Sequence, residues 1–106
     1  MPVLSADQRR AASAKAVAAR QARAAVSQAL KRGDVGVVSV LERVEHDEAL
    51  AGMRVLSLLE SLPRYGSTRA AQALDRLHIA PNRRLRGLGA TQRAALAALA
   101  ERRGPS

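Results

Sequence analysis

The sequence VLSLLESL, residues 55–62, is the most apolar stretch of this 106-residue chain. Its large apolar side chains recur at the spacing of one broad helix face. They are Val55, Leu56, Leu58, Leu59 and Leu62. The spacing predicts a helix that supplies the centre of the hydrophobic core, and Pro63 follows it in a turn.

The segment after this turn is predicted to be a second packed helix. Residues 63–66, Pro-Arg-Tyr-Gly, have the composition of a tight turn, and Ser67 or Thr68 then opens a helix that runs to residue 77. Its inward face is expected to consist of Ala70, Ala73, Leu74 and Leu77. The two helices and their turn therefore form a helical hairpin.

A last helix is predicted near the C-terminus. Residues 81–82, Pro-Asn, mark a further turn, and Thr91 can cap a helix over residues 92–102. Leu96 and Leu99 would lie on its inner face. Between the turn and this helix, Leu85 and Leu88 interrupt a run of arginines and are expected to anchor it to the core.

The N-terminal side begins with a long helix. Ser5 is expected to be its N-cap, and residues 6–31 are dominated by Ala, Arg and Gln without a Gly or Pro. Val26 and Leu30, four residues apart, can dock its end on a core. The first half has little to bury, so we expect it to project, and Gly33 to end the helix.

The middle of the chain predicts shorter elements. Residues 34–38 are a connector, Ser39 can cap a helix over residues 40–45, and Asp47 can cap another over residues 48–51. Neither a repeat nor the alternation of a central strand is present. We therefore expect an all-α fold of about five helices. Its parts would be a basic N-terminal helix or arm, residues 1–32, and a compact helical domain, residues 33–106.

Positive charge is the most informative bulk property. Lys and Arg number 18 against 9 Asp and Glu, so the formal net charge is +9. Residues 1–32 carry a net +6, residues 33–62 a net −4 and residues 63–106 a net +7. Such a surplus attracts polyanions in a salt-dependent way, although a solvated basic surface without a partner is the alternative. Tyr65 is the only aromatic residue, which favours duplexes over single strands bound by stacking.

Enzymatic and metal chemistry find no support in the sequence. The chain has no Cys, no phosphate-binding GK[ST] loop and only two His, so we expect no catalysis, cofactor or metal. The carboxylates of the middle segment are interpreted as helix caps and exposed faces: Glu42, Glu45, Asp47 and Glu48. His46 is expected at the surface and His78 at a helix end. Since no long apolar run begins the chain, a cytoplasmic location is expected.

The turn at residues 63–66 is the first candidate binding element. The first amides of the following helix have no intrahelical partner and lie at the positive end of its dipole, so they can hold a phosphate. Gly66 would permit a positive φ and a close approach of the backbone. Arg64 and Arg69 add charge beside the turn. An ordinary helical hairpin without a ligand is the alternative.

The second candidate is an arginine-glycine loop before the last helix. Arg83, Arg84 and Arg86 precede Gly87 and Gly89. Arginines on such a loop can reach phosphates or a minor groove, the alternative being a flexible, solvated loop. Further candidates are Arg93 and the basic residues of the N-terminal helix, which is alternatively a merely solvated helix: Arg9, Arg10, Lys15, Arg20 and Arg23.

Several blocks of the sequence together resemble the actinobacterial integration host factor family. They are LSADQRRAASAKAVAARQARA, MRVLSLLESLP, GSTRAAQALDRL and IAPNRRLRGLGATQRAAL. The resemblance covers nearly the whole chain. It implies a helix-two-turns-helix nucleoid-associated protein that bends duplex DNA with little sequence specificity and supports compaction, recombination and transcription.

The resemblance also implies which residues contact DNA. Hairpin contacts fall on Pro63, Arg64, Tyr65, Gly66, Ser67, Thr68 and Arg69, and the basic cluster on Arg83, Arg84, Arg86, Gly87 and Gly89. The family typically has a lysine where this chain has Ser67, so we expect side-chain charge to matter most in the arginine loop. DNA binding as a monomer is the prediction. The rivals are a structured-RNA-binding module and a protein-interaction module that uses the acidic middle segment.

Overall fold

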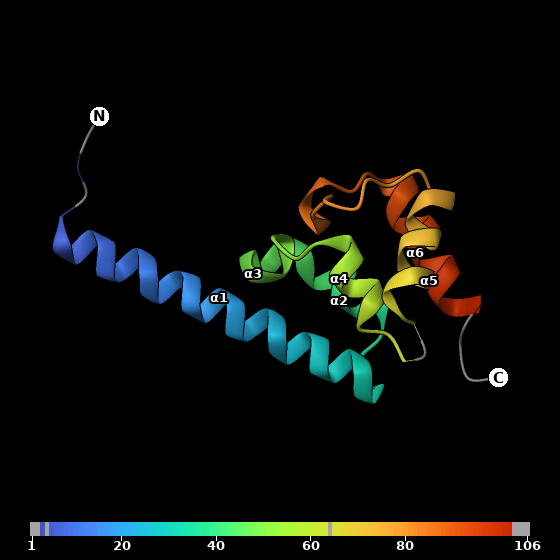
Figure 1. Cartoon of the computed structure of the whole chain (residues 1–106), viewed down its shortest axis with the longest axis horizontal. Coiled ribbons are helices and arrows are strands. Elements are labelled where there is room, and N and C mark those ends of the chain that lie inside the picture. The colour runs from blue at the N-terminus through green and yellow to red at the C-terminus, as the bar shows by residue number, and fades with distance from the viewer. Residues whose placement is uncertain (1–2, 4, 64, 103–106) are drawn as a thin grey trace.

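The computed structural model of the chain describes residues 3, 5–63 and 65–102. Their helices are α1 (Ala6–Arg32), α2 (Val37–Arg43), the 3-10 helix η1 (Val44–His46), α3 (Glu48–Ala51), α4 (Val55–Glu60), α5 (Ser67–Arg76), the 3-10 helix η2 (Leu85–Gly87) and α6 (Ala90–Arg102). This order confirms the all-α fold with a long N-terminal helix (Figure 1). We call residues 37–102, from α2 to α6, the body.

Helix α1 begins and ends where its sequence predicts. The Ser5 hydroxyl accepts a hydrogen bond from the backbone N–H of Gln8 at 3.1 Å. The Gln8 side chain in turn accepts from the Ser5 backbone N–H at 2.8 Å, which completes a capping box. At the other end, Gly33 adopts a left-handed φ of 79° and its N–H donates to the Leu30 carbonyl.

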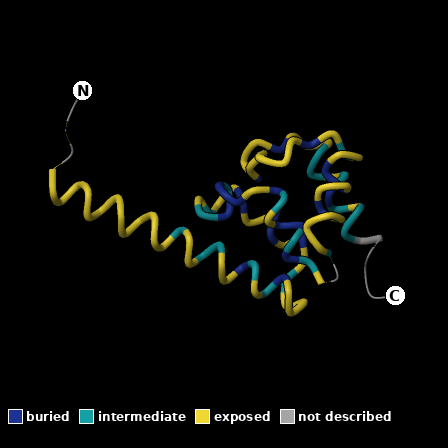
Figure 2. Tube along the Cα trace, viewed as in Figure 1, coloured by how far each residue is buried: buried dark blue, intermediate teal, exposed yellow. Residues whose placement is uncertain are grey.

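Only the C-terminal half of α1 packs on the body. Residues 5–18 are exposed throughout, whereas Val26 and Leu30 are buried (Figure 2). The 27-residue helix is about 40 Å long. The Cα radius of gyration is 15.4 Å, against about 13 Å for a compact chain of this length. The prediction that the first half projects is confirmed.

Helix α2 begins earlier than the sequence predicts. Its N-cap is Gly36, without a side-chain cap, so the expected cap Ser39 and the expected connector through residue 38 were wrong. Val37 and Val40 are both buried, and packing of these side chains outweighs the capping preference of a serine. The cap of α3 is confirmed, because the Asp47 carboxylate accepts from the N–H groups of Ala49 and Leu50.

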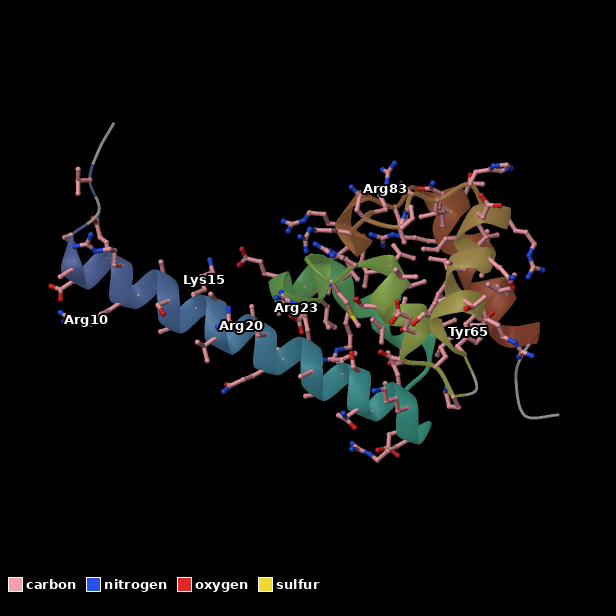
Figure 3. The ribbon with its side chains drawn as sticks, viewed as in Figure 1. Arg10, Lys15, Arg20, Arg23, Tyr65 and Arg83 are labelled. Carbon is pink, nitrogen blue, oxygen red and sulfur yellow. The ribbon has the colours of Figure 1, made fainter. Side chains whose placement is uncertain are left out.

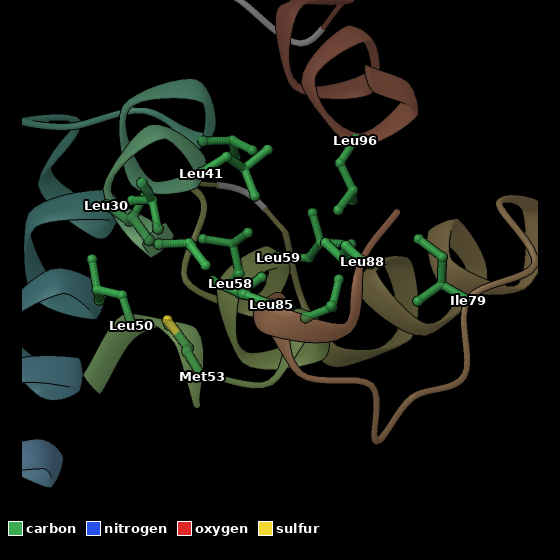
Figure 4. Packing of buried hydrophobic residues seen from close by; sticks show 14 of the residues in the cluster. Leu30, Leu41, Leu50, Met53, Leu58, Leu59, Ile79, Leu85, Leu88 and Leu96 are labelled. Atoms are coloured by element: carbon green, nitrogen blue, oxygen red, sulfur yellow. The ribbon is translucent and has the colours of Figure 1, made fainter. Parts of the chain in front are cut away.

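Helix α4 lies at the centre of the core, as its sequence predicts. Val55, Leu58 and Leu59 are completely buried, and Leu56 and Leu62 are partly buried against them. The cluster extends into every α-helix of the described chain (Figure 4), and its largest fully buried side chains are Leu30, Leu50, Leu58, Leu59, Leu74, Leu85, Leu96, Val40 and Val55. Each such leucine stabilises the fold by about 2 kcal/mol through burial.

Helices α5 and α6 cover this centre, and α5 packs directly on α4. The predicted inner face of α5 is confirmed for Ala70, Ala73 and Leu74, while Leu77 follows the helix and is half-buried. Thr91 lies within α6 and is not its cap. The side chain of Gln92 instead accepts a hydrogen bond from the backbone N–H of Gly89, the residue just before the helix.

Candidate nucleic-acid interface

The arginine-glycine segment, residues 83–89, is held by its backbone and by leucines. Arg54 and Arg84 form an isolated antiparallel bridge, in which the Val55 N–H donates to the Arg83 carbonyl and the Leu85 N–H to the Met53 carbonyl, both at 2.9 Å. Leu85 is fully buried and Leu88 nearly so. We call this segment the arginine loop. The prediction that its leucines anchor it is confirmed.

The three arginines of the loop do not have equivalent surroundings. Arg83 donates to the Gly87 carbonyl at 3.0 Å, within the loop itself. Arg84 donates to the carbonyl of Gly52, the residue that ends α3. Arg86 is exposed, and its Nη2 lies 3.4 Å from the point where a Cβ on Gly52 would be. All three arginines are exposed, and Arg84 is the one whose side chain fixes the loop to the end of α3.

Of the two glycines of the loop, Gly87 permits a close approach, whereas a Cβ on Gly89 would meet nothing within 4 Å. A Cβ on Gly87 would lie 3.0 Å from Cδ of Arg83, so glycine leaves room for the arginine to fold back over the loop. Gly89 is exposed and its carbonyl accepts from the Arg93 N–H in the first turn of α6. The Arg93 residue itself is half-buried.

The loop meets helix α1 across a groove that no sequence pattern indicates. This hollow, which we call the arginine groove, has a volume of about 440 Å³. Its lining residues come from α1, α3 and the arginine loop, and they are Lys15, Ala18, Ala19, Ala22, Arg23, Glu48, Ala49, Gly52, Arg84 and Arg86. A second hollow of about 400 Å³ shares Arg23, Gly52 and Arg84 with it and adds Arg54.

Residues of helix α3 contact the basic side chains of α1 that line the arginine groove. Arg23 donates to the Ala49 carbonyl at 3.5 Å, and Lys15 forms an exposed ion pair with Glu48 at 3.5 Å. None of the ion pairs found among the described residues includes Arg23, Arg84 or Arg86. Arg23 and Arg84 are thus oriented by backbone carbonyls, and a carboxylate neutralises none of the three guanidinium groups within an ion pair of the described residues.

The turn at residues 63–66 differs from the expectation in one respect. Gly66 has φ −100° and ψ 176°, which is extended backbone, so the expected positive φ was wrong. It is the N-cap of α5, where no side chain caps the helix, and Ser67, Thr68 and Arg69 beyond it are exposed. Tyr65 packs partly against the core, Pro63 is exposed, and Arg64 lies outside the described residues.

The two candidate elements lie on different sides of the body. In Figure 3, Arg83 is at the upper edge of the body and Tyr65 at its lower edge. The structure therefore brings the arginine loop together with Lys15 and Arg23 of α1, but not with the turn. Arg9, Arg10 and Arg20 are exposed on α1 outside the arginine groove, and Arg10 is paired with Asp7.

Sequence reasoning missed two residues of this region. No sequence pattern points to Gly52, yet it is buried where Arg23, Arg84 and Arg86 converge. Arg54 was not considered, although it is exposed and bridges to Arg84. No spacing or composition could have indicated either role, because both depend on contacts between segments distant in the sequence.

Within the described part of the chain, no group of three or more His, Cys, Asp or Glu is arranged to hold a metal ion, and no helix has the length and apolar character needed to cross a membrane.

The match to a known family model identifies the class of protein to which this fold belongs. The family model of the S13-like H2TH domain matches residues 30–99, which span the end of α1 and all of the body except residues 100–102. The described fold is therefore that of a helix-two-turns-helix protein. A solved structure, sIHF bound to an 8-bp palindromic DNA, has a TM-score of 0.79 and 41% sequence identity, and covers 81% of this chain and 97% of that one.

Relatives of known identity show which family within this class the chain belongs to. The integration host factors of Mycobacterium tuberculosis and Mycolicibacterium smegmatis are each 50% identical over 96 residues, 91% of this chain and 91% of theirs. That of Streptomyces coelicolor is 43% identical over 91% of this chain and 90% of its own length. The chain belongs to the integration host factor family.

Proposed function

We propose that this protein is a nucleoid-associated protein that binds double-stranded DNA with low sequence specificity, bends and compacts it, and thereby supports recombination and transcription. The observation that carries the proposal is the 41% identity to sIHF, which was solved bound to an 8-bp palindromic DNA. The net charge of +9 supports it independently, because most of the affinity of a protein for duplex DNA comes from phosphate neutralisation.

In this proposal the arginine loop supplies the main side-chain contacts. Arg83 and Arg86 are exposed on a backbone fixed by Leu85 and Leu88, so ordering them on DNA costs little conformational entropy. Arg84 acts mainly by holding the loop to Gly52. Gly87, Gly89 and Arg93 complete the contact surface, and Lys15 and Arg23 extend it onto α1.

The turn before α5 supplies a separate contact through its backbone. The first amides of α5 follow Gly66 without a side-chain cap, and they lie at the positive end of a ten-residue helix. Arg69 is exposed beside them. Because the turn and the arginine loop lie on different sides of the body, we propose that they contact different stretches of the backbone (Figure 3).

Specificity is expected to be weak. Bases in the major groove are read by several polar side chains on one helix, and the exposed face of α5 offers Arg69, Gln72 and Arg76. We also propose that residues 1–32 act as a basic arm and residues 33–106 as the DNA-binding domain. The protein would act as a monomer in the nucleoid of the cytoplasm, as a binding protein without catalytic activity or a cofactor.

A salt titration with random-sequence duplex tests the proposal. If about six phosphates are neutralised, the logarithm of the binding constant should fall with that of salt with a slope of about −5. A slope near zero would contradict the proposal. Structured RNA of equal length, added as a competitor, should displace the duplex weakly. If bound DNA stays straight in cyclisation assays, the bending role fails even where binding holds.

The substitution Gly66→Ser tests the turn by itself. A serine at this N-cap can accept a hydrogen bond from an amide of α5, which should raise the free energy of unfolding by about 0.5 kcal/mol. The same hydrogen bond occupies an amide that a phosphate would use. We therefore expect weaker DNA binding together with unchanged or higher stability. An unchanged affinity would show that DNA does not contact the turn.

A further inference from the structure

Three arginines from two segments, α1 and the arginine loop, converge on one buried glycine. Nη1 of Arg23 lies 3.6 Å, and Nη2 of Arg86 3.4 Å, from the point that a Cβ on Gly52 would occupy. These two nitrogens are therefore at most 7.0 Å apart, which is the sum of the two distances. The Arg84 guanidinium donates to the carbonyl of the same glycine. Gly52 thus forms the floor of a cluster of like charges.

The cluster lacks the partners that would make it a structural ion-pair network. The only acidic residue lining the arginine groove is Glu48, which is exposed at its edge and paired with Lys15. Each guanidinium carries five N–H donors, and Arg23 and Arg84 each use one on a carbonyl of α3. Like charges held this close repel one another, so an anion with several negative charges would relieve the repulsion.

The shape of the site favours a small ligand. The remaining lining residues are Ala18, Ala19, Ala22 and Ala49, whose short side chains leave the hollow open between the charged groups. Its volume of about 440 Å³ falls in the range of small-molecule sites, about 300–1,000 Å³. The five ionisable lining residues carry a net charge of +3.

We propose that the arginine groove is a binding site for a free oligophosphate, an anion with two or three linked phosphate groups such as a nucleoside di- or triphosphate bears. One guanidinium group can bind two phosphate oxygens at the same time. Several guanidinium groups that approach from different directions therefore match two or three linked phosphates better than they match a single phosphate. The inference goes beyond the proposed function and does not require it. Since Arg84 and Arg86 also belong to the arginine loop, an oligophosphate in the groove would compete with duplex DNA.

The experiment measures binding of inorganic triphosphate to the full chain by titration calorimetry, with orthophosphate as the comparison. Triphosphate should bind at least about tenfold more tightly. Arg23→Gln should weaken it about tenfold, whereas Arg20→Gln removes the same charge from α1 outside the groove and should leave it unchanged. Equal effects of the two substitutions would overturn the proposal, because they would show mere charge screening.

A second pair of variants keeps every arginine. Ala18 is exposed and lines the groove, so Ala18→Glu places a carboxylate among the guanidinium groups and should abolish triphosphate binding without lowering the unfolding midpoint. Ser13→Glu adds the same charge at an exposed residue that does not line the groove and lies well away from Ala18 around the helix, so it is the control and should bind as the wild type does. If Ala18→Glu still binds triphosphate, the proposal that the arginine groove is the binding site is wrong.

A third measurement separates the oligophosphate site from the proposed binding of duplex DNA. Triphosphate should displace a short duplex from the wild type but not from Ala18→Glu. If the wild type binds duplex while triphosphate neither binds nor competes, the oligophosphate site fails and DNA binding stands. If triphosphate binds and duplex does not, the proposed DNA function fails and the site stands.

Discussion

The arginine loop and the outer half of α1, residues 6–18, carry similar charge on differently supported backbones. The loop is fixed by a fully buried Leu85, by backbone hydrogen bonds on both sides of Arg84, and by the contact of that arginine with Gly52. The outer half of α1 is exposed along its whole length and reaches the body through one exposed ion pair, Lys15 to Glu48.

This difference indicates which positive charges can bind phosphates at the lower cost in conformational entropy. A cation on a fixed backbone loses little freedom when it contacts a phosphate, whereas a cation on a weakly held helix brings the ordering of that helix into the binding cost. The net +2 of residues 6–18, from Arg9, Arg10 and Lys15 against Asp7, is therefore expected to contribute less per charge than the arginines at 83 and 86.

The largest effect is expected where the loop is anchored. Leu85→Ala removes a fully buried side chain and should lower the free energy of unfolding by about 3 kcal/mol. Val38→Ala, at a residue that is 39% exposed, is the control and should change it by less than about 0.5 kcal/mol. Urea denaturation measures both. Similar values for the two would mean that Leu85 does not anchor the loop.

The next effect compares the two basic regions on DNA directly. Arg83→Gln combined with Arg86→Gln should weaken duplex binding about 10- to 100-fold at low salt and reduce the salt slope by about 2. Arg9→Gln combined with Arg10→Gln removes the same charge from α1 and should weaken binding less than about threefold. Fluorescence anisotropy at several salt concentrations gives both numbers. If both double variants lose the same duplex affinity, the support of the backbone does not affect what a charge contributes to binding.

A smaller effect tests how independent the outer half of α1 is. Ala12→Gly with Ala16→Gly should cost about 2 kcal/mol of local helix stability and reduce the helical circular dichroism signal. The unfolding midpoint of the body should hardly change, because both residues are exposed and lie before the packed half of α1. Ala71→Gly, exposed on α5, should instead lower the unfolding free energy by about 1 kcal/mol. If the two α1 substitutions lower the unfolding midpoint as much as Ala71→Gly does, residues 6–18 unfold cooperatively with the body.

The smallest effect is expected at the ion pair between α1 and α3. Glu48→Gln removes the partner of Lys15, and since both side chains are more than 70% exposed, the loss of stability should not exceed about 0.5 kcal/mol. Glu45→Gln, a comparable exposed position in η1, is the control. Thermal denaturation at low and high salt measures the difference. A loss above about 1 kcal/mol would show that this pair holds α1 to the body.

Much of the fold could be predicted because it depends on local sequence. Ser5 with Gln8, Asp47 before α3 and Gly33 after α1 are signals of helix ends that require only neighbouring residues. The leucine spacing in residues 55–62 likewise identified α4 as the centre of the core. The cap predicted at Ser39 was wrong, because burial of one face of α2 outweighs the capping preference of a single serine. Gly66 has an extended backbone in place of a positive φ, so the freedom of a single glycine did not indicate the shape of the turn.

The sequence by itself determined the all-α fold, the central position of α4, the buried face of α5, the projecting half of α1 and the two basic ends. The tertiary structure alone decided that Arg23 and the arginine loop meet at Gly52, and that the turn lies on another side of the body (Figure 3). The physical reason is sequence distance. Arg23 is 26 residues from the Ala49 carbonyl and Arg84 is 32 from that of Gly52. Periodicity and capping act within a few residues, whereas only packing of the whole core places such distant groups together.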